Sequence, residues 1–360
     1  MNNETNIINF TRGVPPVDAF PTRQIQECST SVLDAYSSTI LQYRPSQGFI
    51  PLREWIGEKY GVSTDNVLVS NGSLQIQVFL SAVLAQSGDV VLVEEPSYDR
   101  AITAYRKNDL EVIGVPLEDD GFNLEVLEML VVEKKPKFFY IIPDFQNPSG
   151  IVTSKAKRES LVNLAEEYNF YILEDNPYKE LRYWGEDIPS IYSSGSEKVF
   201  FFSSFSKVLS PGLRVGYVVG PVEAIKQAAK IAEDTYITPS MLSQGIVYEF
   251  CRRGWLEPGI ERLRDLYRPK LVTLISSLEE NLPEARWTKP DGGFFVGVYL
   301  PQGINMSDIR SRGLDVGLKL SDGAGFYADG SGDSFLRLPF CALSENEIEE
   351  GIRRLGLLMG

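Results

Sequence analysis

The stretch that decides how this chain folds is Ser203-Ser-Phe-Ser-Lys207-Val-Leu-Ser-Pro-Gly-Leu-Arg214, which follows the apolar run 199–202. Serine hydroxyls, backbone N–H groups and an arginine fork are the groups that bind a phosphate dianion. A lysine beside such a phosphate, at the edge of a sheet, is desolvated and therefore nucleophilic. We interpret the stretch as a strand that ends in a phosphate site next to a reactive lysine. The alternative is a serine-rich turn with two solvated cations.

Short runs rich in β-branched and aromatic residues alternate with longer amphipathic stretches on both sides of this motif. The predicted strands are 67–70, 90–94, 111–116, 138–142, 171–175, 199–203 and 215–220, and the predicted helices include 74–85 and 155–168. Such alternation predicts an α/β domain with a mostly parallel sheet. Because ligands of these sheets bind at the carboxyl ends of the strands, the residues that follow each run are the first candidates for a site.

The pattern changes near residue 260. A long helical stretch at 260–281 is followed by predicted short strands at 293–299 and 334–339 and predicted helices at 306–312 and 345–357. These elements predict a small α+β domain, and the N-terminal 40 residues, rich in Pro and Gly, are expected to lie beside it. We therefore predict a large domain over residues 41–258 and a small domain formed by residues 1–40 and 259–360.

The composition is that of an ordinary globular protein, with 43% hydrophobic and 23% charged residues. No apolar run is long enough for a membrane helix, and the N-terminus lacks the basic and apolar regions of a secretory signal, so we expect a cytoplasmic protein. The net charge of −14 argues against a nucleic-acid partner. Cys28, Cys251 and Cys341 are scattered, which indicates free buried thiols and neither a disulfide framework nor a metal site.

The sequence contains no histidine. This excludes Ser-His-Asp and Cys-His catalytic arrangements and the usual zinc sites. If the protein is an enzyme, its acid–base group is Lys, Asp, Glu, Tyr or Cys. A lysine whose pKa is tuned by its surroundings is the leading candidate.

Two further motifs follow predicted strands. Asn71-Gly72-Ser73 opens a predicted helix, and the free N–H groups of a helix start bind anions; the alternative is that Ser73 merely caps the helix. Asp175 ends an apolar strand, and Tyr178 lies three residues later. A buried aspartate needs a cationic partner, for which a protonated pyridine nitrogen is suited. The alternative is an exposed aspartate in an ordinary turn.

Two more motifs bear on the substrate. Asn147-Pro-Ser-Gly150 follows the predicted strand 138–142, and this composition is also that of a plain turn. Arg337 lies between apolar residues in Phe335-Leu-Arg337-Leu-Pro-Phe, which indicates a paired guanidinium for a carboxylate ligand. The alternative is an Asp or Glu partner within the protein.

Together these motifs resemble the fold-type I aminotransferases that depend on pyridoxal 5′-phosphate (PLP), specifically the class I/II group that includes aminoadipate and kynurenine aminotransferases. The resemblance runs from about residue 8 to residue 357. It comprises Phe10-Thr-Arg-Gly-Val-Pro, Leu41-Gln-Tyr-Arg-Pro-Ser-Gln-Gly, Asn71-Gly-Ser-Leu-Gln, Glu95-Pro-Ser-Tyr98, Gln146-Asn-Pro-Ser-Gly, Glu174-Asp-Asn-Pro-Tyr178, the Lys207 motif and the Arg337 motif.

The resemblance implies a large PLP-binding domain with a mostly parallel sheet and a small α+β domain. It implies that Lys207 carries the cofactor as a Schiff base and that Asp175 pairs with the pyridine nitrogen. It further implies that Tyr178 and Asn147 contact the ring 3-oxygen and that Tyr98 stacks on the ring. Lys207, Asp175 and Tyr178 are thus the expected catalytic residues.

The same resemblance assigns the phosphate and the substrate. Ser73, Leu74 through its N–H group, Ser204, Ser206 and Arg214 are similar to the family's phosphate site, and Tyr43 is similar to the residue that reaches the phosphate of the neighbouring subunit. Gly13, Asn147 and Arg337 are similar to the site of the substrate α-carboxylate. Arg12 replaces the first glycine of the family's Gly-Gly pair, and we include it as a candidate substrate contact.

The expected activity is transfer of an amino group between an L-amino acid and a 2-oxo acid, by a homodimer with shared active sites. One alternative is another PLP reaction on the same fold, such as elimination, ring-closing synthase chemistry or oxidation of an amino acid, because the fold does not decide among them. A second alternative is a non-catalytic regulator, but regulators of this fold normally carry an N-terminal DNA-binding domain, which we do not expect here.

Overall fold

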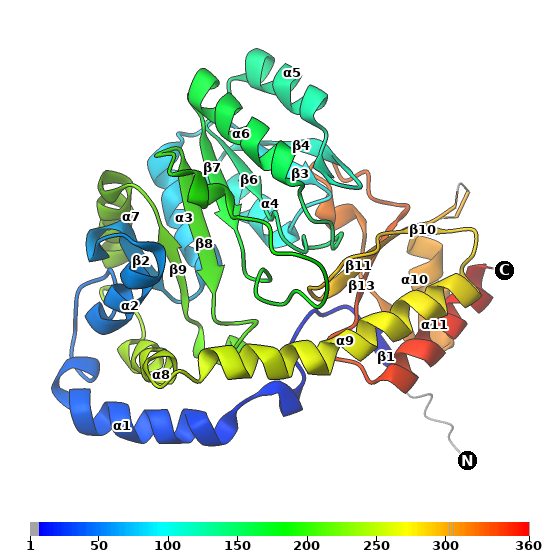
Figure 1. Cartoon of the computed structure of the whole chain (residues 1–360). Coiled ribbons are helices and arrows are strands. Elements are labelled where there is room, and N and C mark those ends of the chain that lie inside the picture. Colours follow the sequence, from blue (N-terminus) through cyan, green and yellow to red (C-terminus); the bar gives the residue numbers. More distant parts are fainter. Residues whose placement is uncertain (1–6, 302, 305, 360) are drawn as a thin grey trace.

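A computed structural model of the chain describes residues 7–301, 303–304 and 306–359. Its centre is an eight-stranded sheet with the strand order β2-β9-β8-β7-β6-β3-β4-β5 (Figure 1). The strands are β2 (Val67–Ser70), β3 (Val90–Glu95), β4 (Glu111–Glu118), β5 (Gly121–Phe122), β6 (Phe138–Ile141), β7 (Tyr171–Asp175), β8 (Val199–Ser204) and β9 (Gly216–Val219). Each predicted strand of this sheet is present to within a few residues, and only the short β5 had not been expected.

The direction of the strands gathers the motifs at one edge of the sheet. The strands β4, β3, β6, β7 and β8 are parallel, whereas β9 runs antiparallel between β8 and β2. The carboxyl ends of β2, β3, β6, β7 and β8 therefore lie together with the amino end of β9. Asp175 is the last residue of β7 and Ser204 the last of β8. Parts of the chain that are distant in sequence thus meet where ligands of such sheets bind.

Helices cover both faces of the sheet. In β8, Phe200 and Phe202 lie in the core shared with α3 (Ser73–Leu84), α4 (Asp99–Lys107) and α7 (Val222–Tyr236). Phe201 points the other way, into the core of α2 (Ile50–Tyr60) and α8 (Met241–Arg252). The rest of that second face packs against α5 (Leu124–Lys134) and α6 (Lys155–Tyr168). Burial on both faces explains why the strands read as continuous apolar runs.

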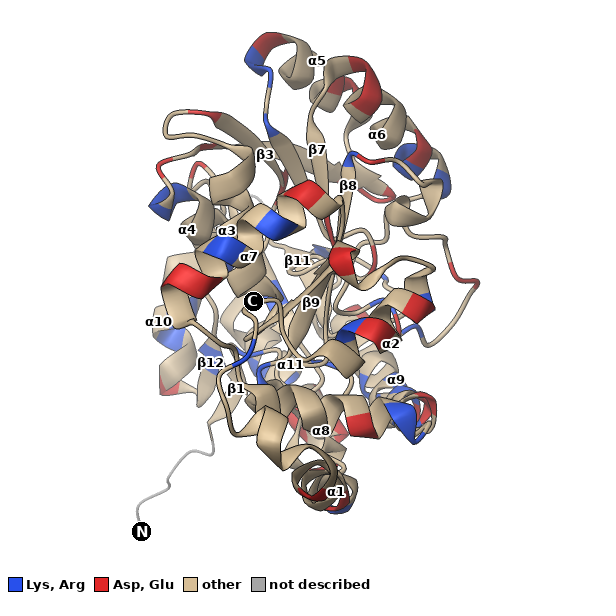
Figure 2. Cartoon of the chain, turned by 90° about the vertical axis from the view of Figure 1, so that its left-hand side faces the viewer, with Lys and Arg blue, Asp and Glu red and all other residues tan. Residues whose placement is uncertain are grey.

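The charged residues lie mainly on the outer helices. Figure 2 shows acidic and basic residues interspersed along α5 and α7, whose outer faces point away from the sheet. Cys28, Cys251 and Cys341 are all buried and free. Among the residues that the structure describes, no cluster of side chains is suited to a metal ion. No helix in the same part of the chain is both long and apolar enough to cross a membrane.

The C-terminal part forms a smaller antiparallel sheet of the order β10-β11-β13. Its strands are β10 (Arg286–Trp287), β11 (Phe295–Tyr299) and β13 (Phe335–Pro339), and its helices are α9 (Leu256–Asn281), α10 (Met306–Asp315) and α11 (Glu345–Met359). The strand β1 (Ile8–Phe10) pairs in parallel with β12 (Leu318–Leu320). The predicted α/β fold with a mostly parallel large sheet and a small α+β part is confirmed.

The N-terminal segment differs in part from the expectation. A 19-residue helix, α1 (Thr22–Ile40), occupies much of a region that had been interpreted only as Pro- and Gly-rich. It packs against α8 through Val32, which contacts Gly245, whereas β1 contacts the C-terminal part. The helix can form because residues 22–44 contain neither proline nor glycine. Its side chains Cys28, Val32 and Ile40 are buried. The predicted domain limits at residues 40 and 258 stay a prediction.

Candidate active site

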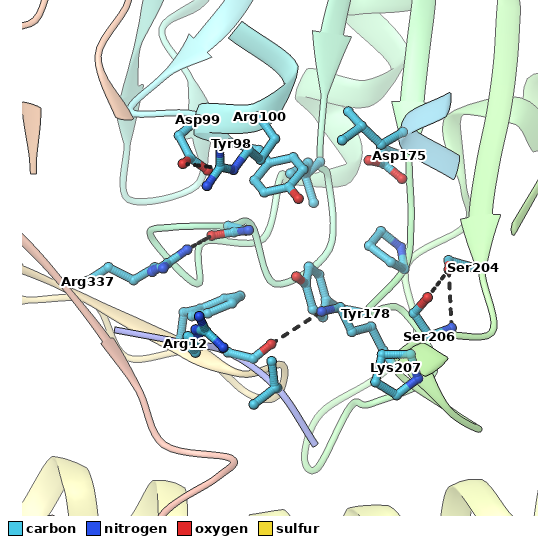
Figure 3. A pocket seen from close by; sticks show the side chains of 18 of the residues that line it. Arg12, Tyr98, Asp99, Arg100, Asp175, Tyr178, Ser204, Ser206, Lys207 and Arg337 are labelled. Atoms are coloured by element: carbon cyan, nitrogen blue, oxygen red, sulfur yellow. Dashed lines mark hydrogen bonds and ion pairs between the residues drawn. The ribbon is translucent and has the colours of Figure 1, made fainter. Parts of the chain in front are cut away.

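A cavity of about 560 Å³ opens where the edge of the large sheet meets the small sheet. Its lining includes most of the residues singled out in the sequence, and Figure 3 shows their side chains turned toward a common space. The predicted residues in the lining are Arg12, Gly13, Ser73, Leu74, Tyr98, Asn147, Asp175, Tyr178, Ser204, Ser206, Lys207, Arg214 and Arg337. Tyr43 is 72% exposed and does not line the cavity of its own chain.

Asp175 is a buried carboxylate that is paired on only one side. Its Oδ2 atom accepts hydrogen bonds from Gln77 Nε2 at 2.8 Å and from the Tyr140 hydroxyl at 2.9 Å. Its Oδ1 atom is buried and has no partner in the described part of the chain. Burial raises the pKa of the Asp175 carboxyl to about 6, although the two hydrogen bonds and the Lys207 charge oppose this shift. A buried carboxylate with one free oxygen in a cavity is suited to a cationic ligand atom.

Lys207 lies in the turn that follows β8. Its Nζ atom donates a hydrogen bond to the Gly13 carbonyl oxygen at 3.3 Å and lies 5.6 Å from the centre of the Tyr178 ring. Burial lowers the pKa of the Lys207 ammonium, and the charges of Arg337 and Arg214 lower it further. A lysine with a lowered pKa presents a larger fraction of nucleophilic free amine at neutral pH.

The start of α3 forms an anion site. Its N-cap is Gly72, with φ of +104°, and a Cβ atom there would lie 2.5 Å from Arg214 Nη2. The position thus requires glycine for both conformation and space. The first N–H groups of α3, at Ser73 and Leu74, have no partner within the helix and border the cavity. The alternative in which Ser73 caps the helix is wrong, because Ser73 is the first helical residue.

Hydroxyls and a guanidinium complete this end of the cavity. Ser204 Oγ donates to Ser206 Oγ at 2.9 Å, and both residues are 8% exposed. Arg214 is exposed and donates from Nη2 to the Asn71 carbonyl oxygen at 3.1 Å. The serine-rich motif is therefore part of a cavity with Lys207 and not a solvated turn. The N–H groups, hydroxyls and guanidinium form a set that matches a phosphate dianion.

Arg337 forms the opposite end of the cavity. Its guanidinium lies between two rings, 5.0 Å from the centre of Phe295 and 4.7 Å from that of Phe326. It donates to Asn147 Oδ1 at 3.0 Å and to the Thr11 carbonyl oxygen at 2.9 Å. Burial lowers the pKa of Arg337. No carboxylate lies within ion-pair distance of Arg337 in the described residues, so the alternative of an internal Asp or Glu partner is not what the structure shows.

The remaining predicted residues frame the space between these two ends. Tyr178 is 3% exposed and packs edge-on against Phe295, with ring centres 5.6 Å apart. Tyr98 precedes the first residue of α4 and is partly buried. A Cβ atom on Gly13 would lie 2.3 Å from the Phe295 ring, so only glycine fits there. Arg12 is exposed at the cavity and has no hydrogen bond or ion pair with other described residues.

Four residues that build the site were not identified from the sequence. Gln77 and Tyr140 hold Asp175, while Phe295 and Phe326 enclose Arg337. Gln77 left a weak signal, because it is a polar residue in the apolar stretch that became α3. The other three are aromatic: Tyr140 and Phe295 lie on apolar runs, where nothing distinguishes them from the core, and Phe326 lies in the Gly- and Asp-containing stretch 321–330, which carries no recognisable signal.

Comparisons with known proteins show what the chain as a whole is similar to. The family model for aminotransferases of class I and II matches residues 5–355. The 2-aminoadipate transaminase of Thermus thermophilus is 35% identical over 355 residues, which cover 97% of this chain and 89% of that protein.

Two solved structures have the same fold. The α-aminoadipate aminotransferase LysN of Thermus thermophilus, complexed with N-(5′-phosphopyridoxyl)-L-leucine, has a TM-score of 0.93 and 34% identity, over 98% of this chain and 92% of that one. The kynurenine aminotransferase of Pyrococcus horikoshii, in complex with PMP, has a TM-score of 0.95 and 34% identity, over 99% and 91%. The chain therefore belongs to the class I and II aminotransferases and is a PLP-dependent enzyme that moves an amino group between an L-amino acid and a 2-oxo acid.

Proposed function

We propose that the cavity holds PLP with Lys207 as its covalent anchor and Asp175 as the partner of its pyridine nitrogen. The observation that carries this assignment is that Asp175 Oδ1, buried and unpaired, lines the same cavity as Lys207. The residues fit PLP. The start of α3, Ser204, Ser206 and Arg214 would bind its phosphate dianion, and the Asp175 carboxylate would accept a hydrogen bond from its protonated ring nitrogen. In this arrangement Tyr98 stacks on the ring, and Asn147 and Tyr178 contact its 3-oxygen.

The bound cofactor supplies an electron sink for a carbanion at the substrate Cα. Asp175 keeps the ring nitrogen protonated, since its carboxylate is buried and Oδ1 has no other donor. Lys207 would hold the cofactor and, as a free amine, would accept the proton of the substrate Cα and return it. Its lowered pKa suits this task, because a free amine has to accept the proton near neutral pH. A chain without histidine can therefore carry out the acid–base steps of transamination.

Arg337 is proposed to bind the substrate α-carboxylate. The two rings hold its guanidinium in one plane, and Asn147 fixes one of its nitrogens, so that a fork is presented to a planar carboxylate. Gly13 lets the Phe295 ring pack directly against the backbone, because a Cβ atom there would lie 2.3 Å from the ring. Arg12 follows β1 at the same cavity with an unpaired guanidinium, and we assign to it the recognition of the side chain of the substrate.

A homodimer with shared active sites is part of the proposal. Leu41, Tyr43 and Ile237 are large apolar or aromatic residues that are 69%, 72% and 57% exposed. Their two segments are adjacent, because the Arg44 N–H group donates to Thr238 Oγ1 at 2.9 Å. A second subunit placed on this patch would bury the three side chains and bring Tyr43 to the phosphate end of the partner's cavity.

The anchor can be located chemically. Borohydride reduction of the PLP-loaded protein should leave the cofactor on the peptide that contains Lys207, as read by mass spectrometry. Lys207→Ala should remain folded but lose the visible absorbance and nearly all turnover, because one residue is both anchor and proton carrier. The control is Lys270→Met, which changes another buried lysine and should load normally. Label on a different lysine, or on none, contradicts the assignment.

The proposed role of Asp175 can be distinguished from the general effect of changing a buried carboxylate. Asp175→Asn should still take up PLP but lower kcat on the order of a hundredfold or more, because a neutral amide does not keep the ring nitrogen protonated. Glu174→Gln is the matched control: this adjacent carboxylate is fully buried, accepts hydrogen bonds from the Ile191 and Tyr192 N–H groups and does not line the cavity. Equal losses in both variants would refute the assignment.

The two arginines are distinguished by the ranking of substrates. Arg337→Lys should lower kcat/KM for all amino acids by a similar factor, roughly ten- to a hundredfold, because every substrate has the α-carboxylate and lysine offers no fork. Arg12→Gly should change the order of preference among amino acids, because side chains differ. The measurement is kcat/KM for a panel of acidic, apolar and aromatic amino acids. A uniform effect of Arg12→Gly, or none, excludes its assigned role and leaves that of Arg337 intact.

The dimer proposal is tested by mass in solution. Sedimentation equilibrium of the loaded protein should give twice the chain mass of 40.3 kDa. Leu41→Asp should yield monomers with weakened PLP binding, because a charge on the patch opposes association and the neighbouring Tyr43 is withdrawn. Leu357→Asp, at a residue that is 67% exposed on α11, is the control and should stay dimeric. Wild-type protein that sediments as a monomer contradicts the proposal.

A further inference from the structure

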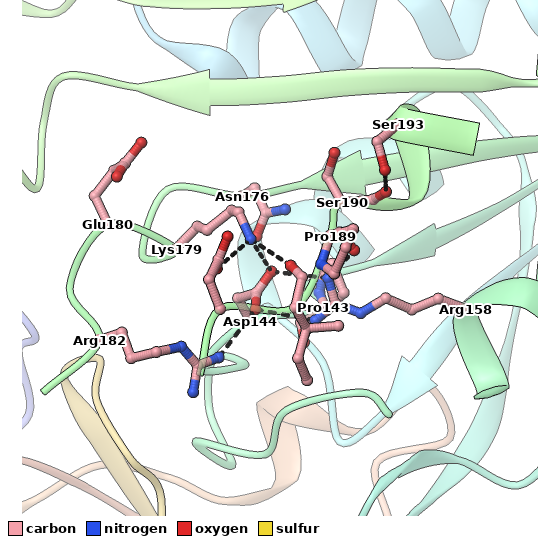
Figure 4. Close-up of polar contacts among 12 residues, drawn as sticks. Pro143, Asp144, Arg158, Asn176, Lys179, Glu180, Arg182, Pro189, Ser190 and Ser193 are labelled. Atoms are coloured by element: carbon pink, nitrogen blue, oxygen red, sulfur yellow. Dashed lines mark hydrogen bonds and ion pairs between the residues drawn. The ribbon is translucent and has the colours of Figure 1, made fainter. Parts of the chain in front are cut away.

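Asp144 lies behind the cavity and has no role in the proposed chemistry. Its side chain is fully buried, three residues before Asn147 in the loop that follows β6. Three cations surround it: Arg158 Nη2 at 2.9 Å from Oδ1, Arg182 Nη2 at 3.5 Å from Oδ1 and Lys179 Nζ at 3.9 Å from Oδ2 (Figure 4). A carboxylate withdrawn from water at this depth is stable only with such partners.

The cations come from two segments, the start of α6 and residues 177–189, which also meet at the hydrogen bond from Arg158 Nη1 to the Pro189 carbonyl oxygen. Arg158 is in the first turn of α6, and its other hydrogen bonds reach the carbonyl oxygens of Pro143, Thr153 and Pro189. Lys179 and Arg182 belong to the segment 177–189, which follows β7. Arg182 also stacks on Phe145, 4.8 Å from the ring centre, and Lys179 donates to Asp187 at 2.7 Å.

The loop of Asp144 and the segment 177–189 each carry one polar group to the cavity. Asn147 is in the loop of Asp144, and Tyr178 is next to Lys179. Between Asp144 and Asn147 the chain reverses at Phe145, whose φ is +53°, a left-handed conformation that costs a non-glycine residue free energy unless its surroundings hold it. The ring contact with Arg182 and the ion pairs of Asp144 are among the contacts that hold this turn, beside the close packing of Phe145 against Gly292 and Gly293. The ion cluster joins the segments of Asn147 and Tyr178 and thus fixes the position of one residue relative to the other.

We propose that Asp144, with Arg158, Lys179 and Arg182, is a positioning cluster that sets where Asn147 and Tyr178 meet the 3-oxygen of the bound cofactor. This role rests on the proposed function, which assigns Asn147 and Tyr178 to that oxygen. None of these ionic groups lines the cavity, so the cluster acts only through the two residues that it holds.

The proposal has a spectroscopic consequence with a definite sign. Lys207 Nζ, when joined to the cofactor, shares a proton with the 3-oxygen. Hydrogen bonds to that oxygen stabilise its anion and therefore lower the pKa of the shared proton. Displacement of Asn147 and Tyr178 should raise this pKa. A direct effect of charge has the opposite sign, because removal of the Asp144 anion disfavours a protonated cation nearby and lowers the pKa.

The experiment follows the visible absorbance of PLP-loaded protein against pH. Asp144→Asn should move the midpoint upward by about half a pH unit or more. Arg182→Lys keeps the charge but loses the guanidinium that contacts Phe145, so it should also move the midpoint upward, by less; it decides the question if Asp144→Asn does not fold. The charged or titratable groups that face Lys207 are Asp175, Tyr178, Arg214, Arg337 and Cys341, and none is altered in either variant.

The matched control is Glu249→Gln. Glu249 is 2% exposed on α8 and pairs with Arg252 at 2.9 Å and Arg253 at 2.6 Å, so it is a second buried carboxylate among arginines, but it does not line the cavity. It should lose thermal stability without a change of midpoint. A downward or absent shift in the cluster variants, or an equal shift in Glu249→Gln, overturns the positioning role. Wild-type protein that does not carry PLP on Lys207 overturns the proposed function itself and this proposal with it.

Discussion

The site depends on one constraint: the large sheet is covered by helices on both faces, so polar groups are confined to the ends of its strands. Asp175, Glu174 and Ser204 are all at or next to the last residue of their strands. Since β9 alone reverses direction between β8 and β2, the amino end of β9 with Arg214 joins the same edge. The loops that form such a site do not have to bind one another directly. The loops are brought together because the strands that precede them are hydrogen-bonded in register.

The same constraint leaves polar groups that have no partner among the described residues. Asp175 has one oxygen and Arg337 a buried Nε atom of this kind. Each such group costs free energy, and under the proposed function the ligands would bring the partner: a cationic ring nitrogen for Asp175 and a carboxylate for Arg337. Binding energy from these groups is therefore available to cofactor and substrate, and the large buried core of α3, α7 and the central strands supplies the stability that tolerates them.

Much of this arrangement could be predicted from the sequence, and the remainder has a common physical cause. Asp175 and Lys207 could be identified because they follow apolar runs, and Arg337 because it is a cation within one. The partners Tyr140 and Phe295 could not, because an aromatic residue on an apolar run has the same pattern whether it fills the core or holds a charged group of the site. Asp144 gave no signal either, since its cations are distant in sequence. The helix α1 was missed because its surroundings at both ends are rich in proline and glycine.

Because the sequence has no histidine, the hydrogen-bond donors that hold Asp175 are other groups than imidazole. An imidazole that donated to Asp175 would itself titrate near neutral pH and would change the charge beside the cofactor. Here the donors are an amide and a phenol. Burial raises the pKa of the Tyr140 hydroxyl well above its usual value, so that it stays protonated and donates across the whole physiological range. Gln77 does not titrate, and the Tyr105 hydroxyl that donates to it at 3.4 Å has a pKa raised by the same burial. The donors on the side of Asp175 that faces the protein therefore keep their protons across the physiological range.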